Sequence, residues 1–103
     1  MIAHVARFDG TAGQLAGATA ALETEVYPEL ARMGGFVQSL FLARRESGEA
    51  LLITLWESEG HVAAAEDRWR ELGSSRGALE ETGGRRTALG QFDVALRTGP
   101  EGR

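Results

Sequence analysis

The sequence contains no cysteine and no lysine. The missing cysteines exclude disulfides, thiolate nucleophiles and zinc–thiolate sites. All 11 basic residues are arginine, and against 15 acidic residues they leave a net charge of −4, which is unfavourable for binding nucleic acid. No apolar run approaches the ~20 residues of a membrane-spanning helix, and the N-terminal MIAHVARFDG lacks the layout of a signal peptide. We therefore expect a cytoplasmic protein that binds neither nucleic acid nor membrane.

Several motifs of catalytic and cofactor-binding sites are also missing. The glycines form no phosphate-binding loop, and no G-x-S-x-G nucleophile elbow occurs. The two histidines, His4 and His61, are separated by most of the chain and do not form a metal-ligand set. The sequence thus predicts a protein without a bound metal or cofactor.

What remains is the composition of an ordinary globular domain. Hydrophobic residues make up 43% and charged residues 25% of a chain of 103 residues. This length corresponds to one domain. We expect the domain to span residues 1–98 and to be followed by a disordered tail over 99–103.

Hydrophobic periodicity predicts six elements of secondary structure. In order, they are a strand over 2–8, a helix over 11–32, strands over 36–44 and 50–56, a helix over 59–72 and a strand over 87–97. Pro28 interrupts the first helix, because proline lacks the backbone donor and clashes with the preceding turn. We expect a kink, or a break followed by a short second helix, near Tyr27–Pro28.

The order β-α-β-β-α-β is that of a ferredoxin-like α+β subunit. Its two helices would pack on one face of a four-stranded antiparallel sheet. The strand over 50–56 is apolar on both sides, with Leu51, Ile53 and Leu55 against Leu52 and Trp56. A sheet face exposed to water would instead carry polar side chains at alternate positions. Since no helix remains to cover the second face, we expect a homodimer formed through the sheet faces.

Four short stretches resemble one known family when they are taken together and in order. They are VARF in the first strand, Pro28-Glu29-Leu30, Gly35-Phe36, and Thr54-Leu55-Trp56-Glu57-Ser58-Glu59. In this combination, the chain is similar over residues 2–97 to the antibiotic-biosynthesis-monooxygenase-like (ABM-like) dimeric α/β barrels. It most resembles the bacterial branch of that family whose chemistry is unassigned.

The resemblance implies a pocket between sheet and helices in each subunit. Family members of one group oxidise polycyclic phenols or anthrones with molecular oxygen and no cofactor, so a small aromatic or polyketide-like ligand is expected. Two alternatives remain open. One is a non-catalytic dimer that binds a small molecule, and the other is a structural dimer whose pocket is filled by side chains.

Single residues of this chain can also be compared with the pocket residues of the family. Trp56 matches the tryptophan that lines the pocket in the cofactor-free oxygenases, and Arg76 matches an arginine on the later helical segment. Leu52 and Val62 stand where that group has asparagine and tyrosine, and Ala6 occupies a pocket-lining position. We take these five residues as candidates for substrate binding.

A second group of the family binds and degrades haem, and this chemistry is disfavoured. The first-strand asparagine of that group is Ala6 here, and the helix tryptophan is Ala64. The stretch that would hold the iron-ligating histidine contains none. Haem is therefore not expected as a ligand.

Three further side chains are candidates, each with a structural alternative. His4 shares a strand face with Ala6 and is a candidate base, although a lone strand histidine is often a hydrogen-bonded core residue. Glu66 either reaches the pocket edge as a second base or pairs with Arg70 at i+4. Tyr27 either faces the pocket or braces the helix break. Trp56 itself either lines the pocket or fills the core.

Overall fold

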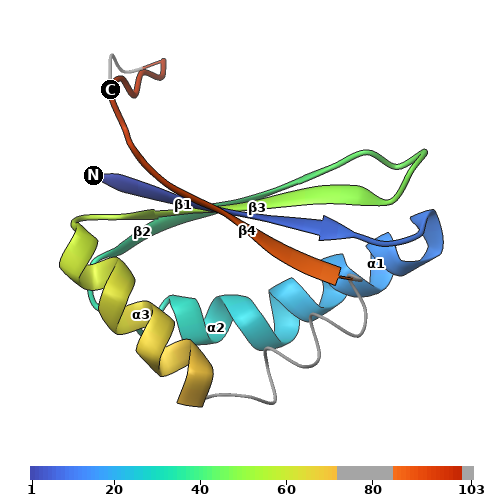
Figure 1. The fold of residues 1–103 in the computed structure, drawn as a ribbon, viewed down its shortest axis with the longest axis horizontal. Coiled ribbons are helices and arrows are strands. Elements are labelled where there is room, and N and C mark those ends of the chain that lie inside the picture. The colour runs from blue at the N-terminus through green and yellow to red at the C-terminus, as the bar shows by residue number, and fades with distance from the viewer. Residues whose placement is uncertain (72–84, 101–103) are drawn as a thin grey trace.

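The computed structural model describes residues 1–71 and 85–100. Its elements are β1 (Ile2–Asp9), α1 (Ala12–Ala21), the π-helical η1 (Leu22–Val26), α2 (Tyr27–Leu30), β2 (Phe36–Ala43), β3 (Glu49–Trp56), α3 (Glu59–Glu71) and β4 (Arg85–Asp93). The strands form one antiparallel sheet in the order β2-β3-β1-β4. All described helices lie on one side of this sheet (Figure 1). The predicted ferredoxin-like α+β subunit is confirmed.

The first helical region begins at a capping box. The side chain of Thr11 accepts the amide of Gln14, while the amide of Thr11 donates to the Gln14 side chain. Further along, η1 widens the helix, and the amide of Tyr27 bonds to the carbonyl of Leu22 five residues earlier. Pro28 follows directly and has no amide to donate. The expected irregularity near Tyr27–Pro28 is therefore a π-helical segment that leads into the short α2.

A bulge in β2 changes which side chains face the helices. Phe36 pairs with Trp56 and Gln38 pairs with Leu55, so Val37 is an extra residue in the ladder. Strict alternation would place Phe36 on the same face as Leu40. The bulge places it instead on the helix-covered face, where its ring lies 5.3 Å from that of Trp56, measured between centroids.

The last strand differs from its predicted range of 87–97. It begins earlier, at Arg85, and its pairing with β1 shifts by one residue beside Gly90, which has φ +112°. It ends at Asp93 because this residue already pairs with Ile2, at the start of β1. Beyond it, the amide of Val94 donates to Met1, and the chain leaves the sheet. Of the tail expected over 99–103, residues 101–103 lie outside the described part.

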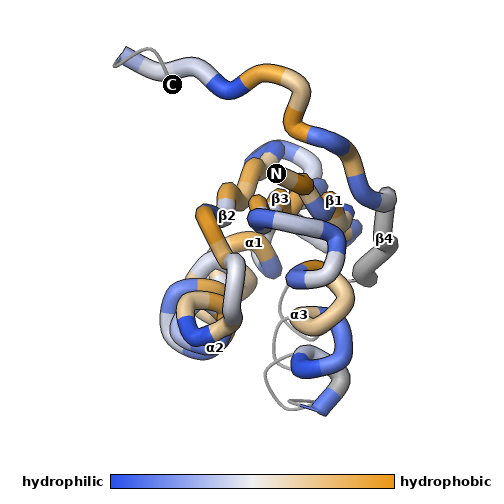
Figure 2. The backbone as a smooth tube through the Cα atoms, turned by 90° about the vertical axis from the view of Figure 1, so that its left-hand side faces the viewer, coloured by the Kyte–Doolittle hydropathy of each residue, from blue (hydrophilic) through white to orange (hydrophobic). Residues whose placement is uncertain are grey.

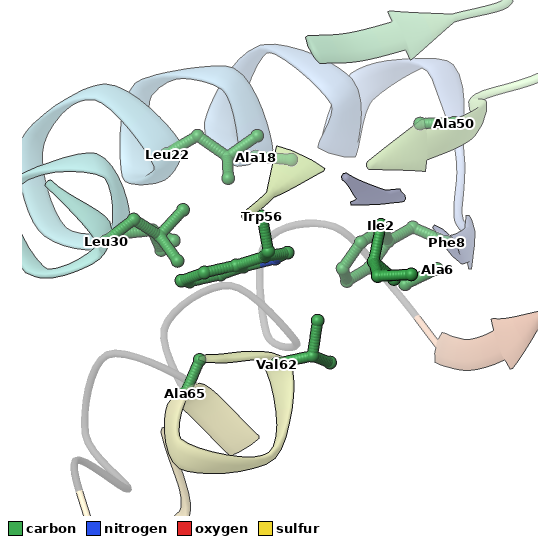
Figure 3. Close-up of a cluster of buried hydrophobic side chains, with 11 residues drawn as sticks. Ile2, Ala6, Phe8, Ala18, Leu22, Leu30, Ala50, Trp56, Val62 and Ala65 are labelled. Atoms are coloured by element: carbon green, nitrogen blue, oxygen red, sulfur yellow. The ribbon is translucent and has the colours of Figure 1, made fainter. Parts of the chain in front are cut away.

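The core lies between the sheet and the helices. Its largest fully buried side chains are Phe8, Val26 and Val62, which come from β1, η1 and α3. Side chains of β1, β3 and the helices converge on this layer (Figure 3). One sheet face thus supplies the hydrophobic burial that holds the subunit together.

The opposite face of the sheet is apolar and is not covered by any described helix. Leu40 and Leu42 of β2 and Phe92 of β4 have exposed fractions of 43%, 48% and 55%. Ile53 and Leu55 of β3 lie between them and are half-buried. Hydrophobic residues recur along β2 and β3 in Figure 2. An apolar patch of this kind on a sheet is typical of an interaction surface.

Gly35 is expected to tolerate no side chain. Its φ is +77°, and a Cβ built on it would overlap the imidazole ring of His61. Gly35→Ala should therefore lower the free energy of unfolding by about 2 kcal/mol or more, which urea denaturation will show. In a His61→Ala background, Gly35→Ala should lower the free energy of unfolding by less, because only the strain of the positive φ remains. An equal loss in both backgrounds would mean that the two groups do not collide.

Candidate functional site

A cavity of about 60 Å³ lies between the sheet and helices α2 and α3. Its apolar lining consists of Leu30, Met33, Leu52, Trp56, Val62, Ala65 and Trp69, and its polar lining of His4, Thr54 and Glu66. Both tryptophans of the chain are in this set. An apolar hollow with a few polar groups on its wall is the usual form of a small-molecule site.

The positions of these residues follow from strand and helix periodicity. His4 of β1 lies opposite Thr54 of β3 in the antiparallel register, so both point to the helix-covered side. Along α3, Val62, Glu66 and Trp69 recur at intervals of four and three residues and share one face of the helix. The cavity forms where this face meets the strands.

Trp56 is both a core residue and a cavity-lining residue. It is 2% exposed, and its indole lies between Leu30 of α2 and Val62 of α3 (Figure 3). The indole Nε1 donates a hydrogen bond of 2.9 Å to the hydroxyl of Thr54, two residues earlier on the same face. The hydrogen bond fixes the ring, so one side of it forms a rigid apolar wall.

The side chains of His4 and Glu66 contact each other on the wall of the cavity, and the contact is an ion pair when the imidazole is protonated. The Nε2 of His4 lies 3.0 Å from Oε1 of Glu66, and the exposed fractions of the two side chains are 14% and 45%. One carboxylate oxygen faces the imidazole, and the lone pairs of the other are available to a ligand. The pair can therefore accept a proton from a group bound in the cavity.

The structure brings together five of the eight side chains that the sequence analysis singled out. His4, Leu52, Trp56, Val62 and Glu66 all line the cavity. Ala6 is 1% exposed and belongs to the core beside it. Tyr27 is 52% exposed, stacks edge-on with Phe36 and lines a second groove, which shares Leu30 and Leu52 with the cavity. Arg76 lies outside the described residues, as does the side chain of Arg70.

Sequence reasoning did not assign five of the lining residues to the site. Thr54 could have been found from its spacing, since a residue two positions before Trp56 shares its strand face. Ala65 and Trp69 belong to the apolar stripe of α3, which periodicity assigns equally well to the core. Leu30 and Met33 follow the π-helical segment, whose extra residue changes the direction of the side chains after it. For these last four residues, no sequence signal distinguishes a cavity-lining side chain from a core side chain.

The described residues contain neither a metal-ligand cluster nor a membrane-spanning helix. In these residues, no group of three or more histidine, aspartate and glutamate side chains is arranged to hold a metal ion. No helix in the part of the chain that the structure describes is long and apolar enough to cross a membrane.

Three solved structures are similar to this chain. A monooxygenase from the gene ActVA-Orf6 of Streptomyces coelicolor, in complex with nanaomycin D, matches with a TM-score of 0.72 and 17% identity, over 96% of this chain and 91% of its own. SnoaB, a cofactor-independent oxygenase from Streptomyces nogalater, matches with a TM-score of 0.68 and 21% identity, over 93% of this chain and 94% of its own. Rv0793 from Mycobacterium tuberculosis matches with a TM-score of 0.64 and 20% identity, over 92% of this chain and 98% of its own.

These similarities concern the fold. At identities of 17–21%, they establish that the chain has the architecture of these proteins over nearly its whole length. The structural resemblance predicted from the sequence, to the ABM-like dimeric α/β barrels, is confirmed at this level. No protein-family model matches the sequence, and no curated protein matches it.

Proposed function

We propose that the protein is a cofactor-independent monooxygenase acting on a small aromatic or polyketide-like molecule bound in the cavity. The observation that carries this proposal is the His4–Glu66 pair, at 3.0 Å, on the wall of a mostly apolar hollow. A carboxylate in such surroundings can remove a proton from a phenol or from an activated methylene group. Two proteins with this fold, from Streptomyces coelicolor and Streptomyces nogalater, are oxygenases.

In the proposed reaction, the substrate supplies the electrons. Glu66 takes a proton from the methylene carbon of an anthrone, and the resulting carbanion reduces dioxygen and combines with it to form a peroxide. Glu66 returns the proton to the peroxide, which then loses water and leaves a carbonyl group. The balance is one anthrone and one O₂ to one anthraquinone and one H₂O. The His4 imidazole donates to the Glu66 carboxylate and holds it in place.

The apolar walls have a second role in this chemistry. Trp56, Val62 and Trp69 line the protein side of the cavity and would keep water away from the face of the substrate that lies against them. The cavity is smaller than typical ligand pockets of ~300–1,000 Å³. Met33 lines it and is half-buried, and its unbranched thioether side chain can adopt other rotamers. We infer that ligand entry displaces the Met33 side chain.

The test is oxygen uptake with 1,8-dihydroxy-9-anthrone. The purified protein should accelerate oxygen consumption over the buffer rate, and with isotopically labelled O₂ the anthraquinone should contain one labelled oxygen atom. A rate equal to that of heat-denatured protein, with the anthrone nevertheless bound, would refute the enzymatic proposal.

A non-catalytic small-molecule-binding dimer is the second candidate. It is favoured by Leu52 and Val62, which are apolar where the cofactor-free oxygenases have asparagine and tyrosine. Binding of an aromatic ligand without oxygen uptake would support this function over the first.

We further propose that two copies associate through the uncovered sheet face. Leu40→Asp should convert a dimer into a monomer, because a carboxylate would be buried without a partner at the interface. Leu40 is 43% exposed in the single subunit, so the subunit itself should remain folded. Ala63→Asp, on the exposed side of α3, is the matched control. Analytical ultracentrifugation distinguishes the outcomes, and an unchanged mass for Leu40→Asp would contradict this interface.

A further inference from the structure

A charged groove adjoins the cavity between the C-terminal side of α2 and helix α3. Its volume is about 310 Å³, and its walls include Glu29, Arg32 and Arg68. Met33 and Ala65 line both the groove and the cavity. These two side chains therefore form the partition between the two spaces. Movement of Met33 would open one into the other.

The groove carries one arginine on each side. Arg32 follows α2 and has a side chain that is 76% exposed, while Arg68 lies on α3 and is 55% exposed. Each has an acidic neighbour at i−3 or i+3: Arg32 Nη1 lies 3.6 Å from Glu29, and Arg68 Nη1 lies 3.3 Å from Glu71. A guanidinium has five N–H donors, so these long, single contacts leave donors for a ligand.

The charge of the groove contrasts with that of the whole protein. The chain has a net charge of −4, whereas the two guanidinium groups of the groove are balanced by the carboxylates of Glu29 and Glu71. The groove is therefore close to neutral and repels an anion less than the average surface does. Planar guanidinium groups are suited to carboxylates, which they can bind through two parallel hydrogen bonds.

We propose that the groove binds a carboxylate of the same molecule whose aromatic part occupies the cavity. This inference rests on the proposed function and narrows its substrate class to aromatic carboxylic acids. The ring system would lie against Trp56 with its reacting group at Glu66, and the carboxylate would extend past Met33 to Arg32 and Arg68. The two arginines then select the substrate and fix its direction in the site, while the chemistry stays at Glu66.

The experiment compares two probes that differ by one carboxylate. They are 6-hydroxy-2-naphthoic acid and 2-naphthol, and their affinities are measured by isothermal titration calorimetry. The wild-type protein should bind the acid more tightly. In the double variant Arg32→Gln/Arg68→Gln, affinity for the acid should fall roughly tenfold, while affinity for 2-naphthol should not change. Raising the salt concentration should also reduce the preference of the wild-type protein for the acid over 2-naphthol.

The matched control is Arg44→Gln/Arg45→Gln, which also removes two positive charges, but at the turn between β2 and β3. It should leave the affinity for both probes unchanged. Equal wild-type affinity for the two probes, or an equal loss in the control, would overturn the carboxylate site and leave the proposed function standing. If neither probe binds to the wild type, the aromatic cavity fails as a ligand site, and the carboxylate site fails with it.

Discussion

Replacing Glu66 with glutamine is expected to lower the rate of oxygen consumption with an anthrone by about 10²–10⁴-fold. The amide has nearly the same size and can still contact His4, which lies 3.0 Å from the carboxylate. It cannot accept a proton from carbon, so the first step of the reaction loses its base. Steady-state oxygen uptake measures the effect, and calorimetry with 2-naphthol should show that ligand binding is retained.

Two further variants serve as controls for the Glu66→Gln result. Glu59→Gln removes a carboxylate from the first turn of the same helix, where it is exposed, and should leave the rate unchanged. His4→Gln keeps a donor near the Glu66 carboxylate and should cause a smaller loss than Glu66→Gln. If Glu66→Gln retained the wild-type rate while the protein stayed folded, proton removal by this pair would be excluded.

Replacing Trp56 with alanine is expected to lower the free energy of unfolding by about 3–5 kcal/mol. The indole is 2% exposed, packs against Phe36 and bonds to Thr54. Its removal would leave a void in the core and a buried hydroxyl without its donor. Because small domains are stable by about 5–15 kcal/mol, the loss is a large part of the total. Urea denaturation followed by circular dichroism will measure it.

Trp69→Ala is the matched control for this variant. Trp69 lines the same cavity from α3 but is half-buried, so its removal should cost clearly less. A loss for Trp56→Ala that is no larger than that for Trp69→Ala would show that Trp56 is not a core residue.

Much of the fold could be predicted because the periodicity of β1, β3 and α3 is regular. Alternation along β3 correctly places Leu52, Thr54 and Trp56 on one face, and the interval from Val62 to Trp69 correctly identifies the inward face of α3. The break near Pro28 was predictable from the missing backbone donor. These features depend on local chemistry that single residues specify.

Other features depend on contacts between distant segments. The bulges beside Val37 and Gly90 shift the register, and strict alternation cannot reveal which residue is extra. His4 and Glu66 could be chosen separately from the sequence, but their contact is set by the docking of α3 on β1. The groove between Arg32 and Arg68 likewise exists because the end of α2 lies beside α3. Such juxtapositions carry no signal in a single sequence.

The central claim, that the cavity beside the His4–Glu66 pair is the ligand site, is tested most directly by a crystal structure of the protein with 2-naphthol. We predict that the naphthalene ring lies between Trp56 and Val62, with its hydroxyl within hydrogen-bonding distance of the Glu66 carboxylate and with the Met33 side chain displaced. Naphthol bound elsewhere at saturating concentration, with the cavity and Met33 unchanged, would contradict the account.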